Sequence, residues 1–347
     1  MSYSRREFGQ AMLAGIPMAL LLRGRINPTV NGVRLGAITY SFHDMPNVVG
    51  QDHVDAVIED CQGAGVGLLE LMSNHVEPVS EFQGRRGAAG GNGTPSAATA
   101  GPSNTGANAG TTAPAAVGGT PPSVRGRSPE AMKAREALRQ WRLTTPMTHF
   151  EGIKKKLNDA GIVVYAYTVN GMGADYTDDE IDKMFEQAKT LGAVTISSST
   201  TLDVAQKLVP FAEKHQFPVA FHNHEQIDDP NQFARPESFY KAMAMSKWFR
   251  INLDIGYITG SNYDAVGFIQ QNHERITHLH MKDRKKDLGP SVPWGEGDTP
   301  VKEVLTLLKK NRYPIPALVE LSYPVPADSN CTKEVAKCMA YMKAALA

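Results

Sequence analysis

Cysteine is scarce in this sequence of 347 residues. The three cysteines, Cys61, Cys331 and Cys338, are an odd number and form no C-x-x-C pair. A disulfide scaffold or a zinc site built on thiolates would need more cysteines at closer spacing, so the sequence argues against both. Cys331 and Cys338 lie seven residues apart in a predicted helix, and we expect them to be small buried apolar residues on one helix face.

The sequence also lacks a surplus of charge of either sign. Lys and Arg number 36, Asp and Glu number 36, and the formal net charge is zero. Nucleic-acid-binding proteins usually show a basic surplus or stripe, because phosphate contacts dominate their affinity. The composition therefore argues against a nucleic-acid partner, and 41% hydrophobic residues are typical of a globular fold.

The N-terminal hydrophobic run is too short for a comfortable transmembrane helix. It covers residues 11–22, whereas a membrane span needs about 20 residues. Arg5 and Arg6 precede it, and the pattern resembles a twin-arginine (Tat) export signal. We expect residues 1–30 to be a signal peptide, the Tat translocase to be a partner during export, and the protein to be periplasmic or otherwise exported. The alternative is a basic, frayed N-terminus.

A low-complexity segment covers residues 84–128. It consists almost entirely of Gly, Ala, Ser, Thr, Pro and Asn. Such a composition cannot bury enough apolar surface to offset the entropy of an ordered chain. We interpret it as a disordered insertion within one domain, which runs from residue 31 to residue 347, because the patterns on both sides belong to one architecture.

That architecture alternates apolar runs with amphipathic stretches. The strand candidates are residues 34–42, 66–72, 162–169, 193–199, 217–224, 250–257, 276–283 and 316–323. The helix candidates are residues 52–63, 147–160, 178–191, 201–215, 236–246, 263–273, 300–312 and 330–346. Such βα units imply parallel strands with right-handed crossovers. No G-x-G-x-x-G follows the first strand, so we predict a closed (β/α)8 TIM barrel rather than a dinucleotide-binding open sheet.

Ionisable residues gather near the ends of the predicted strands, where a TIM barrel carries its chemistry. They are Glu70, His222, His224, Asp254, His278, His280, Lys282, Arg284 and Glu320. Each has a plain structural alternative: a histidine can be a satisfied core residue, Glu70 a charge at the rim facing water, and Asp254 a cap on the turn that follows. Their convergence favours a site, since imidazole and carboxylate ligands from neighbouring strands suit a divalent cation.

From Arg34 onward the sequence resembles the xylose-isomerase-like sugar isomerase/epimerase superfamily, which also contains endonuclease IV. The motifs that carry the resemblance are LGAITYSF, LLELM, AFHNH, NLDIGY, HLHMKDR, PWGEGDTP and LVELSY. HLHMKDR followed by WGEGDTP is the most specific of these. The resemblance implies one divalent metal ion, most often Mn²⁺, with Zn²⁺, Co²⁺ and Fe²⁺ as alternatives.

By position, the resemblance implies the ligands His222, Asp254, His280 and Glu320. Two departures from the family pattern stand out. A histidine replaces the usual glutamate on the fifth strand, which leaves His224 as an alternative ligand to His222. The fourth strand ends in TISSST, so Ser199 or a neighbour stands where many relatives carry a carboxylate.

The chemistry of such a site can be argued from the residues. A sugar carbonyl and its neighbouring hydroxyl can chelate a cation, which polarises the carbonyl and stabilises an enediolate. Glu70, His224 and Glu320 are candidates for the base that takes the proton. Lys282 and Arg284 can hold the developing oxyanion or substrate hydroxyls.

Two further residues are assigned to substrate binding. His278 lies on the same strand as His280, and Trp294 lies in the loop after that strand. Trp294 can stack on a sugar face, because an aromatic ring offers a flat apolar surface, or it can pack beneath its loop.

Three functions fit this set of residues. The first is a metal-dependent isomerase or epimerase of an unphosphorylated sugar. The second is a lyase or hydrolase of 3-keto-glycosides, which begins with the same proton abstraction. The third is an exported sugar-binding barrel without turnover, favoured by the missing carboxylate. A small sugar or glycoside is the expected ligand in every case, because no phosphate-gripping motif is present and export favours a free sugar.

Overall fold

The computed structural model describes residues 26–80, 128–169, 172 and 175–347. Most of the predicted signal peptide (1–30) and nearly all of the predicted insertion (84–128) lie outside these ranges. Among the described residues, no helix combines the length and the apolar character that a membrane span requires.

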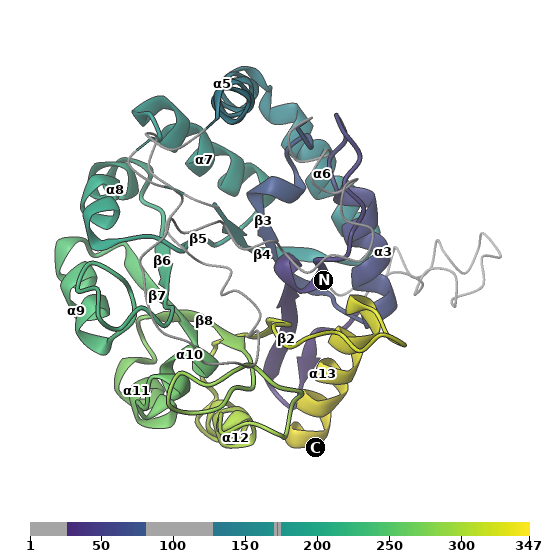
Figure 1. Ribbon diagram of the computed structural model, residues 1–347, viewed down its shortest axis with the longest axis vertical. Coiled ribbons are helices and arrows are strands. Elements are labelled where there is room, and N and C mark those ends of the chain that lie inside the picture. The colour runs from purple at the N-terminus through teal and green to yellow at the C-terminus, as the bar shows by residue number, and fades with distance from the viewer. Residues whose placement is uncertain (1–25, 81–127, 170–171, 173–174) are drawn as a thin grey trace, which may run out of the picture.

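Eight parallel strands form a closed barrel, which confirms the predicted fold class (Figure 1). The strands are β2 (Val33–Ile38), β3 (Leu68–Met72), β4 (Val163–Thr168), β5 (Thr195–Ser198), β6 (Val219–His222), β7 (Phe249–Asp254), β8 (Ile276–Met281) and β9 (Ala317–Val319). Each pairs with the next in sequence, and β9 pairs back with β2 through Leu35 opposite Ala317. A two-residue strand, β1 (Thr29–Val30), pairs antiparallel with β2, so the first predicted strand is β2.

Helices surround the barrel (Figure 1). They are α3 (Val54–Ala64), α5 (Pro129–Thr144), α6 (Met147–Asp159), α7 (Asp178–Leu191), α8 (Leu202–His215), α9 (Pro236–Met245), α10 (Ile255–Gly260), α11 (Ala265–Asn272), α12 (Val301–Asn311) and α13 (Cys331–Leu346). The α7 helix shows why these boundaries arise. Thr177 and Glu180 form a capping box at its start, and Gly192 adopts the left-handed conformation that ends it.

Several predicted strands are too long. Residues 39–42, assigned to the first strand, form a 3-10 turn, η1 (Thr39–Phe42), and a second turn, η2 (Ser73–His75), follows β3. The run 250–257 contains a helix boundary: β7 ends at Asp254, whose side chain accepts from the Tyr257 backbone N–H and caps α10. Likewise β6 ends at His222, so His224 lies beyond the strand to which it was assigned.

The α5 helix was not predicted. Its only fully buried side chain is Arg142, and Trp141 packs partly buried against the core. Arg142 donates to Glu77 (2.7 and 3.0 Å), and Arg135 donates to both oxygens of Glu180 on α7 (2.8 and 3.0 Å). Ion pairs of Arg142 and Arg135 therefore add to the apolar contact of Trp141 in attaching this helix.

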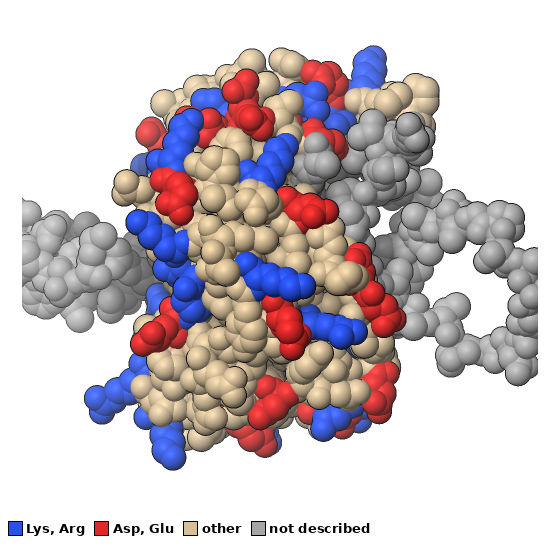
Figure 2. Space-filling view, turned by 90° about the vertical axis from the view of Figure 1, so that its left-hand side faces the viewer, with Lys and Arg blue, Asp and Glu red and all other residues tan. Residues whose placement is uncertain are grey.

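Apolar side chains fill the layer between the barrel and its helices. The predicted burial of Cys331 and Cys338 is confirmed, because both are 1% exposed on α13. On the face shown in Figure 2, basic and acidic side chains are interspersed. Charges of both signs are therefore mixed locally on that face, in keeping with the net charge of zero for the whole sequence.

Candidate active site

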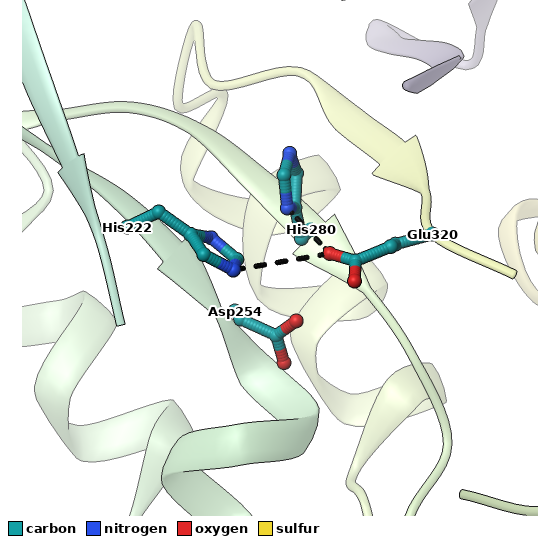
Figure 3. A group of neighbouring side chains, drawn as sticks. All are labelled: His222, Asp254, His280 and Glu320. Carbon is teal, nitrogen blue, oxygen red and sulfur yellow. Dashed lines mark ion pairs between the residues drawn. The ribbon is translucent and has the colours of Figure 1, made fainter. Parts of the chain in front are cut away.

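Four side chains from four neighbouring strands meet inside the barrel (Figure 3). They are His222 at the end of β6, Asp254 at the end of β7, His280 on β8 and Glu320 directly after β9. Their ligand atoms all lie within 4.8 Å of one another. His280 Nδ1 is 2.7 Å and His222 Nε2 4.0 Å from Glu320 Oε2, and the rings of His222 and His280 are 4.6 Å apart. All four are between 0 and 8% exposed.

The donor set fits a divalent cation. His280 Nδ1 and Glu320 Oε2 are buried 2.7 Å apart, and Asp254 Oδ2 is buried 2.9 Å from Lys282 Nζ, but none of these three atoms makes a hydrogen bond of good geometry among the described residues. A divalent cation could coordinate all three, which would offset the cost of burying them. Two imidazoles and two carboxylates suit Mn²⁺, Fe²⁺, Co²⁺ or Zn²⁺ and make a softer set than an all-oxygen magnesium site.

Glu70 lies behind His280, inside the barrel. Its Oε2 is 2.5 Å from His280 Nε2 and 2.9 Å from His278 Nε2, and its Oε1 accepts from the Thr168 hydroxyl at 2.5 Å. Its exposed fraction is 0%, which rules out a charge facing water. Burial raises the pKa of Glu70, but His280 and His278 outweigh it and hold the pKa well below its usual value. The carboxylate is therefore placed to orient His280.

The orientation of His280 has a chemical consequence. When Nε2 donates to Glu70, the neutral ring presents the lone pair of Nδ1 to the cluster. Histidines that bind metals commonly have such a carboxylate on the other ring nitrogen. Burial lowers the pKa of His280, but Glu70 and Glu320 raise it overall to about 10, so a cation must displace a proton from this ring.

Lys282 joins the two carboxylates of the cluster. Its Nζ lies 2.9 Å from Asp254 Oδ2, 2.8 Å from Glu320 Oε1 and 3.8 Å from the centre of the Tyr257 ring. Burial lowers the pKa of Lys282, but Asp254 and Glu320 raise it well above its usual value. Burial alone would raise the pKa of Glu320, yet Lys282 and His280 hold it well below normal. Lys282 is thus a fixed positive charge beside the cluster.

The two histidines of FHNH lie side by side, with ring centroids 4.8 Å apart. His224 Nε2 is 3.4 Å from the hydroxyl of Ser199, which follows β5. Burial lowers the pKa of His222 well below its usual value and that of His224 to about 4. Both rings are therefore neutral at pH 7 and can act as a ligand or a base.

Tyr257 and Asn223 were missed by sequence reasoning. Asp254 Oδ1 accepts from the Tyr257 N–H at 2.7 Å, which leaves Oδ2 to face the cluster. Asn223 holds the backbone of Asp254 through its Oδ1 (2.8 Å) and Nδ2 (3.2 Å). The N-cap preference of Asp was a usable signal for the first contact; nothing in the sequence pattern indicated the second.

The residues assigned to substrate binding lie in different places. Arg284 is an ion-pair partner of Glu225 and also donates to the Gly289 carbonyl. Trp294 packs edge-on against Tyr341 of α13, with 5.8 Å between ring centroids, which favours the packing alternative.

His278 is fully buried beside Glu70. The structure thus places this histidine inside the barrel, and it places Arg284 in contacts with other protein groups. Substrate contacts of His278, Arg284 and Trp294 remain predictions.

Asp283 holds the WGEGDTP loop in place. Its Oδ2 accepts from the backbone N–H groups of Gly295 and Gly297 at 2.7 and 3.0 Å. A Cβ on Gly297 would lie 1.9 Å from Asp283 Oδ1, so the close approach requires glycine there. The loop after β8 begins with the segment that carries Lys282 and Arg284. These contacts tie that segment to Gly295 and Gly297 further along the same loop.

Fold and site together define a (β/α)8 barrel with a His, Asp, His, Glu cluster at the carboxyl ends of its strands. The match to the family of xylose isomerase-like TIM barrels covers residues 153–343. The chain belongs to this family, which confirms the resemblance in the sequence motifs.

Curated relatives match a limited part of the chain. One is an L-ribulose-5-phosphate 3-epimerase, UlaE, from Escherichia coli (strain ATCC 8739), which is 31% identical over 100 residues, or 29% of this chain and 34% of that protein. UlaE from Salmonella paratyphi A is 32% identical over the same shares. The match thus spans about a third of the length of these relatives.

Solved structures share the fold over most of the chain. An L-ribulose 3-epimerase has a TM-score of 0.55 at 10% identity and covers 90% of this chain and 94% of its own. The probable 3-DHS dehydratase AsbF from Bacillus anthracis has a TM-score of 0.53 at 13% identity, with 88% and 98% covered. At these identities the likeness shows the fold alone.

Proposed function

We propose that the protein is a divalent-metal-dependent isomerase or epimerase of an unphosphorylated sugar. The observation that carries this proposal is the cluster of His222, Asp254, His280 and Glu320, whose ligand atoms all lie within 4.8 Å of one another. These residues would hold the ion, which would polarise a substrate carbonyl and stabilise the enediolate. Mn²⁺ is the proposed ion. The epimerase relatives support the reaction class.

His224 is the proposed base. It lies beside His222 without belonging to the cluster, and with its pKa at about 4 it is neutral and can accept a proton from the carbon next to the carbonyl. Glu320 is the weaker candidate because it belongs to the proposed ligand cluster and already contacts Lys282 and His280. Glu70 lies behind His280, which favours an orienting role.

Lys282 is proposed to stabilise the charge that develops on the substrate oxygen. Its ammonium is held between Asp254 and Glu320, so it needs no reorganisation during the reaction. Returning the proton to the other face of the same carbon gives an epimer; returning it to the neighbouring carbon gives an isomer.

The ion pairs that the basic side chains near the site already make support an uncharged substrate. Lys282 already contacts two carboxylates, and Arg284 contacts Glu225. A phosphate group would have to compete with these partners, whereas sugar hydroxyls need only hydrogen bonds. This differs from the phosphorylated substrate in the name of the UlaE relatives.

The test is a screen of the purified protein, loaded with Mn²⁺ or treated with a chelator, against free sugars and 3-keto-glycosides by mass spectrometry. We expect metal-dependent conversion with unchanged mass and altered retention. Loss of the aglycone would establish the lyase instead, and binding without turnover would establish the sugar-binding barrel.

Variants assign the histidines in the same assay. We expect His222→Ala to lose the metal, His224→Ala to keep the metal and lose turnover, and His273→Ala to change neither, because His273 stacks on Tyr313 away from the site. Metal loss in His224→Ala alone would exchange the roles of His222 and His224.

We also propose that the protein is exported through the Tat pathway, on the basis of Arg5 and Arg6. Replacing both by lysine should keep the protein in the cytoplasm in a cell-fractionation assay. Unchanged periplasmic accumulation would contradict the proposal.

A further inference from the structure

We infer that Asn223 is a positioning residue that sets the spacing between His222 and Asp254. The inference rests on the proposed metal site and concerns a residue that makes none of the proposed ligand contacts. The Asn223 side chain is 1% exposed, so its effect must pass through its neighbours.

The need for such a residue follows from where β6 ends. The last pair between β6 and β7 is His222 opposite Asn252, and Asp254 lies two residues further along β7. On its other side, Asp254 is paired with His280 of β8. Beyond His222 the main chain leaves the sheet, since the His224 N–H donates to the Phe233 carbonyl at 2.8 Å.

Asn223 continues the ladder with its side chain. Its Oδ1 accepts from the Asp254 N–H at 2.8 Å, and its Nδ2 donates to the Asp254 carbonyl at 3.2 Å. A carboxamide offers one acceptor and one donor in a plane, as a peptide group does. Aspartate would place a second acceptor against the Asp254 carbonyl, and glutamine would be one methylene too long.

The pair of hydrogen bonds between Asn223 and Asp254 affects two proposed ligands at once. Asn223 is bonded through the main chain to His222. Holding the Asn223 side chain on Asp254 therefore also restricts the position of His222 relative to Asp254. The same contact holds the Asp254 main chain, and the Oδ1 atom of Asp254 caps α10. The Oδ2 atom is then held facing the cluster.

The experiment compares Co²⁺ binding to the full-length wild-type protein, Asn223→Asp and Asn223→Ala, by calorimetric titration and by the visible absorption spectrum of the bound Co²⁺. The control is Asn330→Ala, which removes another asparagine-to-backbone bond, the cap of α13. We expect both Asn223 variants to bind Co²⁺ at least tenfold more weakly with an altered spectrum. The control should lower the melting temperature and leave affinity and spectrum unchanged.

The outcomes separate this inference from the proposed function. A wild-type protein that binds no Co²⁺ overturns both. Wild-type binding with the same affinity and spectrum in folded Asn223→Ala overturns the positioning role alone. Should Asn223→Asp fail to fold, Asn223→Ala decides, because it introduces no charge.

Discussion

At the scale of single residues, Glu70 shows how a buried carboxylate can serve a site without entering it. It contacts both histidines of β8 and Thr168 of β4. A carboxylate in that place fixes which nitrogen of His280 carries the proton, and hence which one faces Glu320.

We therefore predict that Glu70→Gln, which keeps the shape and removes the charge, weakens metal affinity by about 10–100-fold, the usual effect of losing such a partner. The measurement is a titration with Mn²⁺ at pH 7. The matched control is Glu334→Gln, another buried carboxylate, which accepts from Tyr323 beside α13. Equal affinities in wild type and Glu70→Gln would contradict the orienting role.

The sequence could indicate that His222, Asp254, His280 and Glu320 meet, because strand ends converge in a barrel. It could not indicate the order of contacts within the cluster. Asn223 is an ordinary polar residue in the pattern, and its importance arises only because β6 stops one residue before it. That end point depends on the path of the chain after the strand.

At the scale of elements, α5 differs from the other helices in how it is attached. Glu180 of α7 is 0% exposed and receives hydrogen bonds from Arg135 and Arg139. Burial raises the pKa of Glu180, but Arg135 outweighs it and holds the pKa below its usual value. A carboxyl with a lowered pKa stabilises the fold above its unfolded pKa and loses that contribution as the pH falls through its folded pKa.

We predict that Glu180→Gln lowers the free energy of unfolding at pH 7 by about 3 kcal/mol, the lower end for breaking a buried ion pair, since Arg135 and Arg139 are partly exposed. The wild type should lose stability below about pH 4, and the variant should lose less. Urea denaturation at pH 7 and pH 3.5 measures both effects. Glu186→Gln, in a partly exposed pair with Lys183, should change stability by less than about 1 kcal/mol. Parallel pH curves for wild type and Glu180→Gln would contradict this account.

Element boundaries explain where sequence reasoning failed. The order of strands and helices followed from apolar periodicity, which reports burial against a core. The only fully buried side chain of helix α5 is an arginine, which apolar periodicity does not detect. The end of β7 was hidden because its apolar run continues into α10 while the side chain of Asp254 starts a helix. Capping and ion pairing are contacts between particular atoms, and periodicity does not report them.

At the scale of the whole molecule, the barrel closes on itself although its sequence is interrupted. Described residues on both sides of the segment 84–128 belong to one sheet, since β3 pairs directly with β4. The segment therefore falls between two neighbouring strands of one sheet.

We predict that deleting residues 87–125 leaves the melting temperature within about 3 °C of the wild type, because loop closure entropy changes only logarithmically with length. Circular dichroism and Co²⁺ titration of the deletion variant test this. A large drop in melting temperature, or slow hydrogen exchange of these amides in the intact protein, would contradict it.

The pairing of β9 with β2 also determines when, during synthesis, the site comes into existence. At about 5–20 residues per second, tens of seconds separate the appearance of β2 from that of Glu320. His222, Asp254 and His280 emerge from the ribosome earlier, while the edge of β2 that will receive β9 is still unpaired. The complete ligand set thus forms only when the last strand seals the barrel, and a nascent chain that stalls before residue 320 lacks the carboxylate that contacts His280 and Lys282.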